Sequence, residues 1–307
     1  DIRAIADLAH AHGIPLIVDE AHGAHLNWLD GLKCVYRPDD GAGRECVSAL
    51  NMGADMCVQS AHKTLPALTG GAFLHMNERV DADRLLSRVA LTQSSSPSFL
   101  IMASLDSARE YMDEHGRTEL SRVADECERV LDECRTLDIM PAREYFGLDC
   151  DRTRIALDVT PRGITGFAAR DALTQMGIDI EMADARRIVM ICSAVDDKDK
   201  FDALIGGLKR LPRGNGNYAS PKVERVMRGR RAISVRQAAL GAYERVELER
   251  AAGRIAARAL GAYPPGVAEC APGEEISRET CERLLAAQRA GAELFGLERG
   301  LCVVTRE

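Results

Sequence analysis

Apolar residues recur every three or four positions over residues 1–12, a spacing that predicts a helix, and Gly13 is a typical stop for such a helix. The continuous apolar run at residues 14–18 predicts a short buried strand. Further patterns predict strands at 56–59 and 70–75 and a helix at 46–52, which follows a loop rich in Gly, Asp and Pro at 27–44. A helix followed by buried strands is typical of an α/β sheet.

A long helical pattern covers residues 99–137, and strand and helix patterns alternate after it, which indicates a compact α+β unit. The elements predicted for this unit are strands at 154–159, 178–182 and 188–192 and helices at 165–176 and 197–211. Residues 213–217 are rich in Gly and Asn and predict a linker, and the pattern beyond them is mostly helical. We therefore expect three domains, over residues 1–112, 113–213 and 214–307.

Composition and charge fit an ordinary soluble protein, for which a small-molecule substrate is a better default than nucleic acid. The 307 residues are 46% hydrophobic and 28% charged, with a formal net charge of -7 and a pI near 5.6. A negative net charge gives no electrostatic reason to bind nucleic acid. No apolar run reaches the roughly 18 residues of a membrane span, so we expect no membrane segment. The cysteines are scattered without paired or metal-binding spacing, so we expect reduced thiols, a cytoplasmic location and no metal.

Two polar segments follow predicted strands, and each offers a group that pyridoxal phosphate needs. Residues 19–23 are Asp-Glu-Ala-His-Gly, and residues 60–64 are Ser-Ala-His-Lys-Thr. The cofactor aldehyde needs a lysine amine, and its pyridine nitrogen needs a carboxylate that keeps it protonated. Lys63 and Asp19 can meet these two needs. Because ligands of open α/β sheets bind beyond the carboxyl ends of the strands, both residues lie where a cofactor is expected.

The neighbours of this pair suit the rest of the cofactor. Ser60 and His62 flank Lys63 closely enough to donate to a phosphate, and small Ala21 would let a ring lie flat against the backbone. Residues 19–22 also spell a helicase magnesium motif, but the chain shows no Gly-rich phosphate loop of the kind that a nucleotide hydrolase needs.

Each of these residues also has a purely structural interpretation. Most lysines are solvated, and Asp19 could cap a helix. The serines at 94–96 are explained as well by a polar loop before a helix that Ser98 caps as by phosphate donation. The histidines that lack ligand spacing, and that we interpret as surface or packing residues, are His10, His12, His25, His75 and His115.

Four blocks of the chain resemble the Orn/Lys/Arg decarboxylase family of fold-type I pyridoxal phosphate enzymes. The blocks are residues 18–25, 60–69 and 92–98, and the pair of turns at 263–266 and 272–274. The resemblance implies a partial fold-type I α/β large domain, then a small α+β domain, then a mostly helical C-terminal domain. The chain begins at Asp1 inside a helical pattern, so we expect upstream residues that complete the sheet and the cofactor site, and little activity without them.

The resemblance assigns a role to each candidate residue. Lys63 would hold the cofactor, Asp19 would pair with its pyridine nitrogen, and Ala21 would pack on its ring. Ser60 and His62 would contact the phosphate. The residues that would approach the cofactor across a homodimer interface are Ser95 and Ser96.

The implied reaction is decarboxylation of lysine, arginine or ornithine to an amine that leads toward polyamines. Lys63 or His22 would return a proton to the α-carbon. Glu274 is either a partner for the distal cation of the substrate or a solvated loop acid. Gly70 and the long loop at 26–46 depart from the family pattern, so the choice among the three amino acids stays open.

Two other functions stay open. One is an aminotransferase or another lyase on the same fold, in which Arg186 or Arg187 would bind the substrate carboxylate. The other is a non-catalytic partner subunit. The presence of both Lys63 and Asp19 argues against the second.

Overall fold

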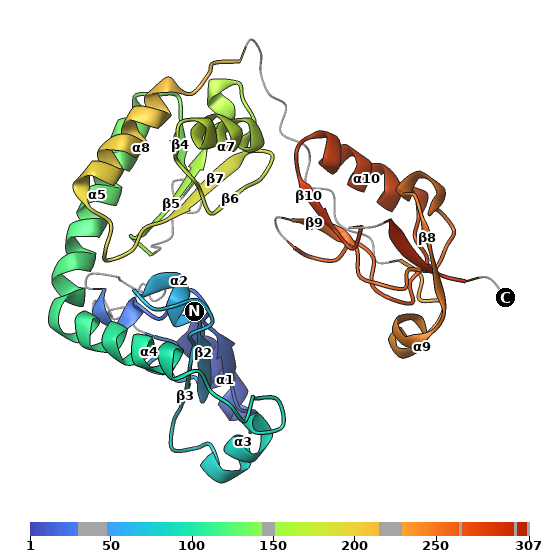
Figure 1. The fold of residues 1–307 in the computed structure, drawn as a ribbon, viewed down its shortest axis with the longest axis horizontal. Helices are drawn as coiled ribbons and strands as arrows, with labels where there is room; N and C mark the ends of the chain where they lie inside the picture. The colour runs from blue at the N-terminus through green and yellow to red at the C-terminus, as the bar shows by residue number, and fades with distance from the viewer. Residues whose placement is uncertain (30–47, 143–150, 215–228, 264–265, 298–299, 306–307) are drawn as a thin grey trace. The chain divides into compact units, whose positions relative to one another are not determined.

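The computed structural model describes residues 1–29, 48–142, 151–214, 229–263, 266–297 and 300–305 (Figure 1). Its chain forms two compact units. The first unit comprises Asp1–Thr136, Pro141–Ile155 and Met190–Gly206, and the second comprises Leu137–Met140, Ala156–Val189 and Gly207–Glu307. The domain boundaries expected near residues 112 and 214 stay predictions.

A three-stranded sheet organises the start of the first unit. Helix α1 (Ile2–Ala11) precedes β1 (Ile17–Asp19), which pairs in parallel with β2 (Met56–Gln59), and β2 pairs antiparallel with β3 (Phe73–Met76). The predicted helix and second strand are confirmed. The other two strands begin three residues later than predicted, because only the residues that face Met56–Gln59 join the ladder. The described part of the helix predicted at 46–52 forms turns instead.

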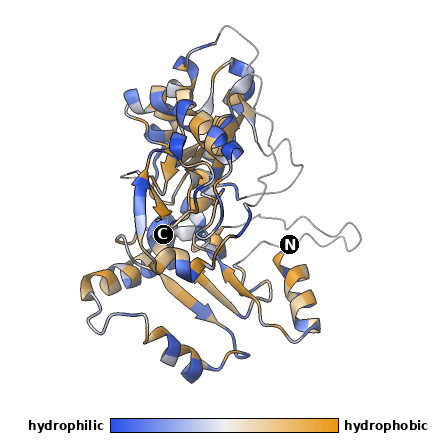
Figure 2. Ribbon diagram, turned by 90° about the vertical axis from the view of Figure 1, so that its right-hand side faces the viewer, coloured by the Kyte–Doolittle hydropathy of each residue, from blue (hydrophilic) through white to orange (hydrophobic). Residues whose placement is uncertain are grey.

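The two faces of this sheet differ in burial. One face places Cys57 in an apolar cluster that includes Ala49 and Ala54. Most of α1 is coloured as hydrophobic in Figure 2. On the other face, the exposed apolar side chains are Ile17, Val58, Leu74 and Met76.

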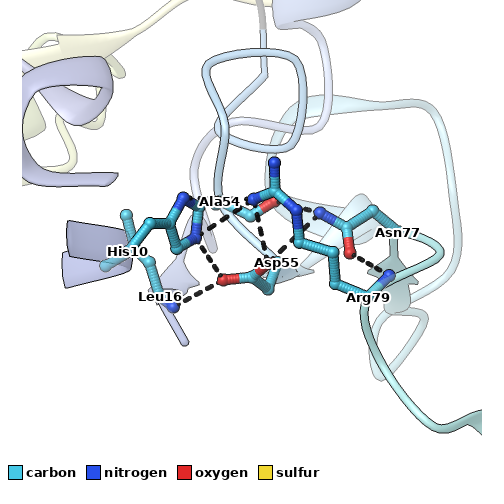
Figure 3. Close-up of polar contacts among 6 residues, drawn as sticks. All are labelled: His10, Leu16, Ala54, Asp55, Asn77 and Arg79. Atoms are coloured by element: carbon cyan, nitrogen blue, oxygen red, sulfur yellow. Dashed lines mark hydrogen bonds and ion pairs between the residues drawn. The ribbon is translucent and has the colours of Figure 1, made fainter. Parts of the chain in front are cut away.

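A network at the amino ends of the parallel strands connects α1 to the sheet (Figure 3). Asp55, just before β2, is buried, and its Oδ2 lies 2.8 Å from His10 Nε2 and accepts a 2.8 Å hydrogen bond from the Leu16 N–H. Its Oδ1 accepts from Asn77 Nδ2 at 3.4 Å and lies 3.5 Å from Arg79 Nη1. Burial acts to raise the pKa of Asp55, but the hydrogen bonds from His10, Leu16 and Asn77 outweigh it and lower the pKa to about 2.

Helices follow the sheet in the first unit. They are α2 (Ala61–Thr64), α3 (Ala82–Val89), α4 (Phe99–Tyr111) and α5 (Arg117–Arg135). A π-helical turn, Met112–Gly116, joins α4 to α5, so the long helix predicted over 99–137 is present with one interruption. Gly116 allows close packing there, because a Cβ would stand 2.8 Å from Met112 Cε and 3.1 Å from Trp28 Cγ.

A second sheet has the strand order β4-β5-β7-β6. Its strands are β4 (Met140–Pro141), β5 (Arg154–Asp158), β6 (Met182–Ala183) and β7 (Arg187–Ile191), and the helices around it in sequence are α7 (Gly166–Gln175) and α8 (Lys198–Arg210). This succession confirms the α+β pattern predicted for the middle of the chain. The strand predicted at 178–182 shares only Met182 with β6, and β4 was not predicted.

The expectation of a mostly helical C-terminal domain is wrong. Its described elements are α9 (Val235–Leu240), β8 (Tyr243–Val246), β9 (Gly261–Tyr263), α10 (Arg278–Arg289), β10 (Glu293–Phe295) and β11 (Leu301–Val304). The strands form two antiparallel pairs, β8 with β11 and β9 with β10. A series of glycine turns with positive φ interrupts this part of the chain and separates α10 from the short strands around it, at Gly253, Gly266, Gly273, Gly291, Gly296 and Gly300.

Within the described ranges, none of the helices is both long enough and apolar enough to cross a bilayer.

Candidate functional site

The segments after β1 and β2 lie side by side at the carboxyl ends of these parallel strands. The Glu20 N–H donates to the Val58 carbonyl at 2.9 Å, and the Ser60 N–H donates to the Ala21 carbonyl at 3.3 Å. The ladder therefore continues past Asp19 and joins the two polar segments through their backbones. This edge is the one at which open α/β sheets bind ligands.

Asp19 is the last residue of β1, and its side chain is exposed. Its Oδ1 accepts a hydrogen bond from the Ala21 N–H at 3.1 Å, while Oδ2 has no partner among the described residues. This local turn fixes the carboxylate at the end of the strand and leaves one oxygen open to a ligand.

The neighbouring acid, Glu20, has a structural role. Its two oxygens accept from the Ala49 N–H and from Gln59 Nε2, each at 2.7 Å. Burial, followed by the nearby Glu20 charge, raises the pKa of Cys57 to about 11, so this thiol is inert near neutral pH. Gly23 makes room for the Glu20 side chain, since a Cβ there would stand 2.1 Å from Glu20 Cγ.

Lys63 is the third residue of the short helix α2, which forms in the polar segment after β2. Ala61 and Leu65 are buried one helical turn apart and anchor the inner face of this helix. The Lys63 side chain is on the exposed side, and its amine pairs with no other described residue. The amine is therefore not committed to a salt bridge within the part of the chain that is described.

Ser60 and His62, which flank Lys63, differ in which of their hydrogen-bond donors could reach a phosphate. Ser60 caps the start of α2 without a side-chain cap hydrogen bond, so its hydroxyl has no such partner within the described part of the chain. His62 is half-buried, and its backbone N–H and its Nδ1 both donate to the Gly71 carbonyl, at 3.3 and 2.9 Å. These bonds fix the loop before β3, and a phosphate contact from His62 would have to use the other ring nitrogen.

The loop that contains the serines at 94–96 makes none of these contacts within the described ranges. Ser95 and Ser96 are exposed between α3 and α4, and in the described ranges no hydrogen bond joins them to residues 19–25 or 60–64. Ser98 caps α4 by accepting from the Ile101 N–H, as the structural interpretation of this loop expects. The contribution of Ser95 and Ser96 across a dimer interface stays a prediction.

The loop after Asp19 has contacts that the sequence did not reveal. Ala21 is half-buried and His22 is exposed, and the His22 carbonyl accepts a hydrogen bond from Arg154 Nη2 at 3.2 Å. His25 is almost completely buried, and its Nε2 lies 2.8 Å from Asp151 Oδ2. Its position inside the first motif block was the only available signal of such a role.

The arginines and the acid considered for substrate binding are engaged elsewhere. Arg186 pairs with the fully buried Asp158, whose Oδ2 is 2.6 Å from Arg186 Nη2. Arg187 lies 3.8 Å from Asp184. Glu274 is buried, and its Oε2 accepts from the Ala271 N–H at 2.9 Å, so it is not a solvated loop acid. No group of three side chains suited to a metal occurs among the described residues.

The sequence matches the two family models that describe the parts of one kind of enzyme. Residues 1–146 match the model for the Orn/Lys/Arg decarboxylase major domain, and residues 216–305 match the model for the Orn/Lys/Arg decarboxylase C-terminal domain. An arginine decarboxylase of Bacillus anthracis is 31% identical over 310 residues, an alignment that covers 97% of this chain and 60% of the relative.

Solved structures give the same fold. A lysine decarboxylase of Francisella novicida superposes with a TM-score of 0.69 at 18% identity, covering 94% of this chain and 53% of the other. Lysine decarboxylase A of Pseudomonas aeruginosa gives a TM-score of 0.67 at 19% identity, with coverage of 95% and 53%. The chain thus has the fold of these fold-type I decarboxylases and spans little more than half of their length.

Proposed function

Because the chain belongs to the Orn/Lys/Arg decarboxylase family, we propose that it uses pyridoxal phosphate to decarboxylate a basic amino acid. The observation that supports this most directly is the hydrogen-bonded contact between the segments that follow β1 and β2. It brings an exposed carboxylate and an uncommitted lysine to one edge of the sheet.

The residues of this edge fit the cofactor. Lys63 would hold it covalently, because its amine is exposed and pairs with no described side chain. Asp19 would keep a proton on the ring nitrogen through its open oxygen, Ala21 would pack on the ring, and the Ser60 hydroxyl would donate to the phosphate. When bound, the cofactor supplies an electron-accepting ring that stabilises the charge left at the α-carbon when carbon dioxide departs.

The remaining task of the chain's own residues is to move a proton. A proton must reach the α-carbon after carbon dioxide leaves, and Lys63 or His22 would deliver it. Both side chains are exposed at this edge. Because the arginine decarboxylase of Bacillus anthracis is 31% identical, arginine is the first substrate to test, ahead of lysine and ornithine. The amine product would be a precursor of polyamines.

We propose further that the enzyme is a homodimer in which Ser95 and Ser96 of one subunit approach the cofactor of the other. The exposed apolar side chains that flank this loop suit an interface, and they are Leu91, Phe99, Leu100 and Met102. The cytoplasmic location stays a prediction from the scattered cysteines, of which those described are buried and unpaired.

The ion pair between Arg186 and Asp158 argues against the aminotransferase alternative, because Asp158 already neutralises one of the two arginines proposed to bind the substrate carboxylate.

The test is an absorbance scan of the protein at its natural length with pyridoxal phosphate, beside Lys63→Ala and the control Lys200→Ala, in which another exposed lysine is removed. We expect a visible band in the wild type and in the control and none in Lys63→Ala. Arginine, lysine and ornithine are then added and carbon dioxide is measured. A band without gas would favour transamination, and a protein without a band would overturn the cofactor assignment.

A further inference from the structure

A buried histidine anchors the loop that follows Asp19. Only 1% of His25 is exposed, and its Nε2 lies 2.8 Å from Asp151 Oδ2, although the two residues are 126 positions apart. A carboxylate can only accept, so Nε2 donates to it and the orientation of the imidazole ring is fixed.

Asp151 is itself held from several sides. Its Oδ1 accepts from the Thr153 N–H at 2.9 Å and from the Thr153 hydroxyl at 2.7 Å. Burial acts to raise the pKa of Asp151, but its hydrogen bond to His25 and the charges of His25 and Arg154 outweigh this and hold the pKa well below its usual range. The carboxylate is therefore ionised at every pH at which the protein would work.

Arg154, the first residue of β5, holds the loop after Asp19 at a second point. Arg154 donates through Nη1 to the Thr153 hydroxyl at 2.8 Å and through Nη2 to the His22 carbonyl at 3.2 Å. The loop is thus fixed at His22 through its backbone and at His25 through its side chain.

The loop between these points is a pair of tight turns. The Gly23 N–H donates to the Glu20 carbonyl at 2.8 Å, and the Leu26 N–H donates to the Gly23 carbonyl at 3.0 Å. Because these two turns connect the residues directly, we expect a displacement of His25 to shift Ala21 and His22 as well. Small errors in the position of such groups reduce catalysis strongly.

We propose that Asp151 and His25 form a positioning pair for the cofactor site, which holds the loop at residues 19–25 so that Ala21 and His22 face the cofactor. This inference rests on the proposed function. Both residues would act through the loop and not by touching the cofactor.

The test uses the full protein and compares two histidine–aspartate pairs that have the same nitrogen-to-oxygen distance, 2.8 Å. Asp151→Ala removes the acceptor of His25, and Asp151→Asn keeps an uncharged acceptor of nearly the same shape. Asp55→Ala is the matched control, since Asp55 is also 2.8 Å from a histidine but lies before the strands. The readouts are hydrogen exchange of the amides at 19–25, visible circular dichroism of the bound cofactor, its dissociation rate, kcat, KM and Tm.

For Asp151→Ala we expect faster exchange at 19–25, an altered circular dichroism of the cofactor, roughly tenfold faster cofactor loss and a kcat about tenfold lower at similar KM. Asp151→Asn keeps the shape but only one accepting oxygen for the donors of His25 and Thr153, so it should show the same changes at a smaller size. These partial changes keep the test valid if the alanine variant does not fold. Asp55→Ala should lower Tm while leaving the cofactor signal unchanged.

The proposal is overturned if the Asp151 variants lose Tm while exchange at 19–25, cofactor signal and kcat stay as in the wild type, which is the behaviour of a merely structural pair. A wild type without a Lys63-dependent cofactor band would instead overturn the proposed function. In that case hydrogen exchange of the cofactor-free protein would still decide whether Asp151 holds the loop, since unchanged exchange at 19–25 would reject it.

Discussion

The two edges of the β1–β2–β3 sheet each have a histidine–aspartate pair at 2.8 Å, and they differ in what surrounds the pair. Before the strands, Asp55 is enclosed by hydrogen bonds that connect α1 to the sheet (Figure 3). After the strands, the pair formed by His25 and Asp151 holds the loop at residues 19–25. The first residue of this loop, Asp19, and the neighbouring Lys63 are both exposed. The same interaction stabilises the fold at one edge and, in our proposal, positions reactive groups at the other.

The largest expected effect separates the two acids at the carboxyl edge. Asp19→Asn should reduce kcat by about 100-fold or more, because the proton on the ring nitrogen would lose its ionic partner. Glu20→Gln is the matched control, since Glu20 is engaged by the Ala49 N–H, the Gln59 amide and the Cys57 thiol rather than open to a ligand. Steady-state kinetics of both variants check this. Equal losses of kcat would show that Asp19 has no special role.

At the amino edge, Asp55→Ala should lower the free energy of unfolding by about 3 kcal/mol. The Leu16 N–H and the His10 ring would lose their acceptor in a part-buried position. Denaturant titration measures this change. A loss well below about 1 kcal/mol would show that water replaces the carboxylate without cost.

The lowered pKa of Asp55 predicts that the stability of the protein depends on pH. Its pKa is about 2 in the folded state against an ordinary value of 3.8, so the stabilisation is complete above pH 4 and is lost as the pH falls through 2. The amount is on the order of 2 kcal/mol. Between pH 5 and pH 2, the free energy of unfolding should decrease less steeply for Asp55→Asn than for the wild type. Parallel curves would contradict the lowered pKa.

The smallest effect is expected for Arg79→Met. Its side chain is 60% exposed and its guanidinium is 3.5 Å from Asp55, so the ion pair is screened by solvent. We expect a loss of no more than about 0.5 kcal/mol in the free energy of unfolding and no change in cofactor binding. A loss comparable to that of Asp55→Ala would place Arg79 at the centre of the network.

Sequence patterns predicted the local elements well and the long-range contacts poorly. The apolar spacing of α1 and the run of β2 are local signals, and both elements were found. The pairing of His25 with Asp151 joins residues 126 positions apart, and nothing in either neighbourhood predicts it. The C-terminal domain was misjudged because its strands are three or four residues long, too short for a periodic signal, and glycine turns separate them.

At the candidate site, the sequence identified residues that the structure leaves exposed, such as Asp19 and Lys63. It assigned no role to Glu20, because the backbone and amide donors that this acid binds come from segments distant in sequence. It also took His62 as a phosphate ligand only, whereas the structure ties it to the Gly71 carbonyl.

The cofactor site at the carboxyl edge is tested most directly by peptide mass spectrometry. The protein is first incubated with pyridoxal phosphate and reduced with sodium borohydride, which would fix the cofactor permanently to the lysine that holds it. We expect a single modified peptide, the one that contains Lys63, in the wild type and in Asp55→Ala. Modification of another lysine, or of none, would contradict a cofactor site at the carboxyl edge of this sheet.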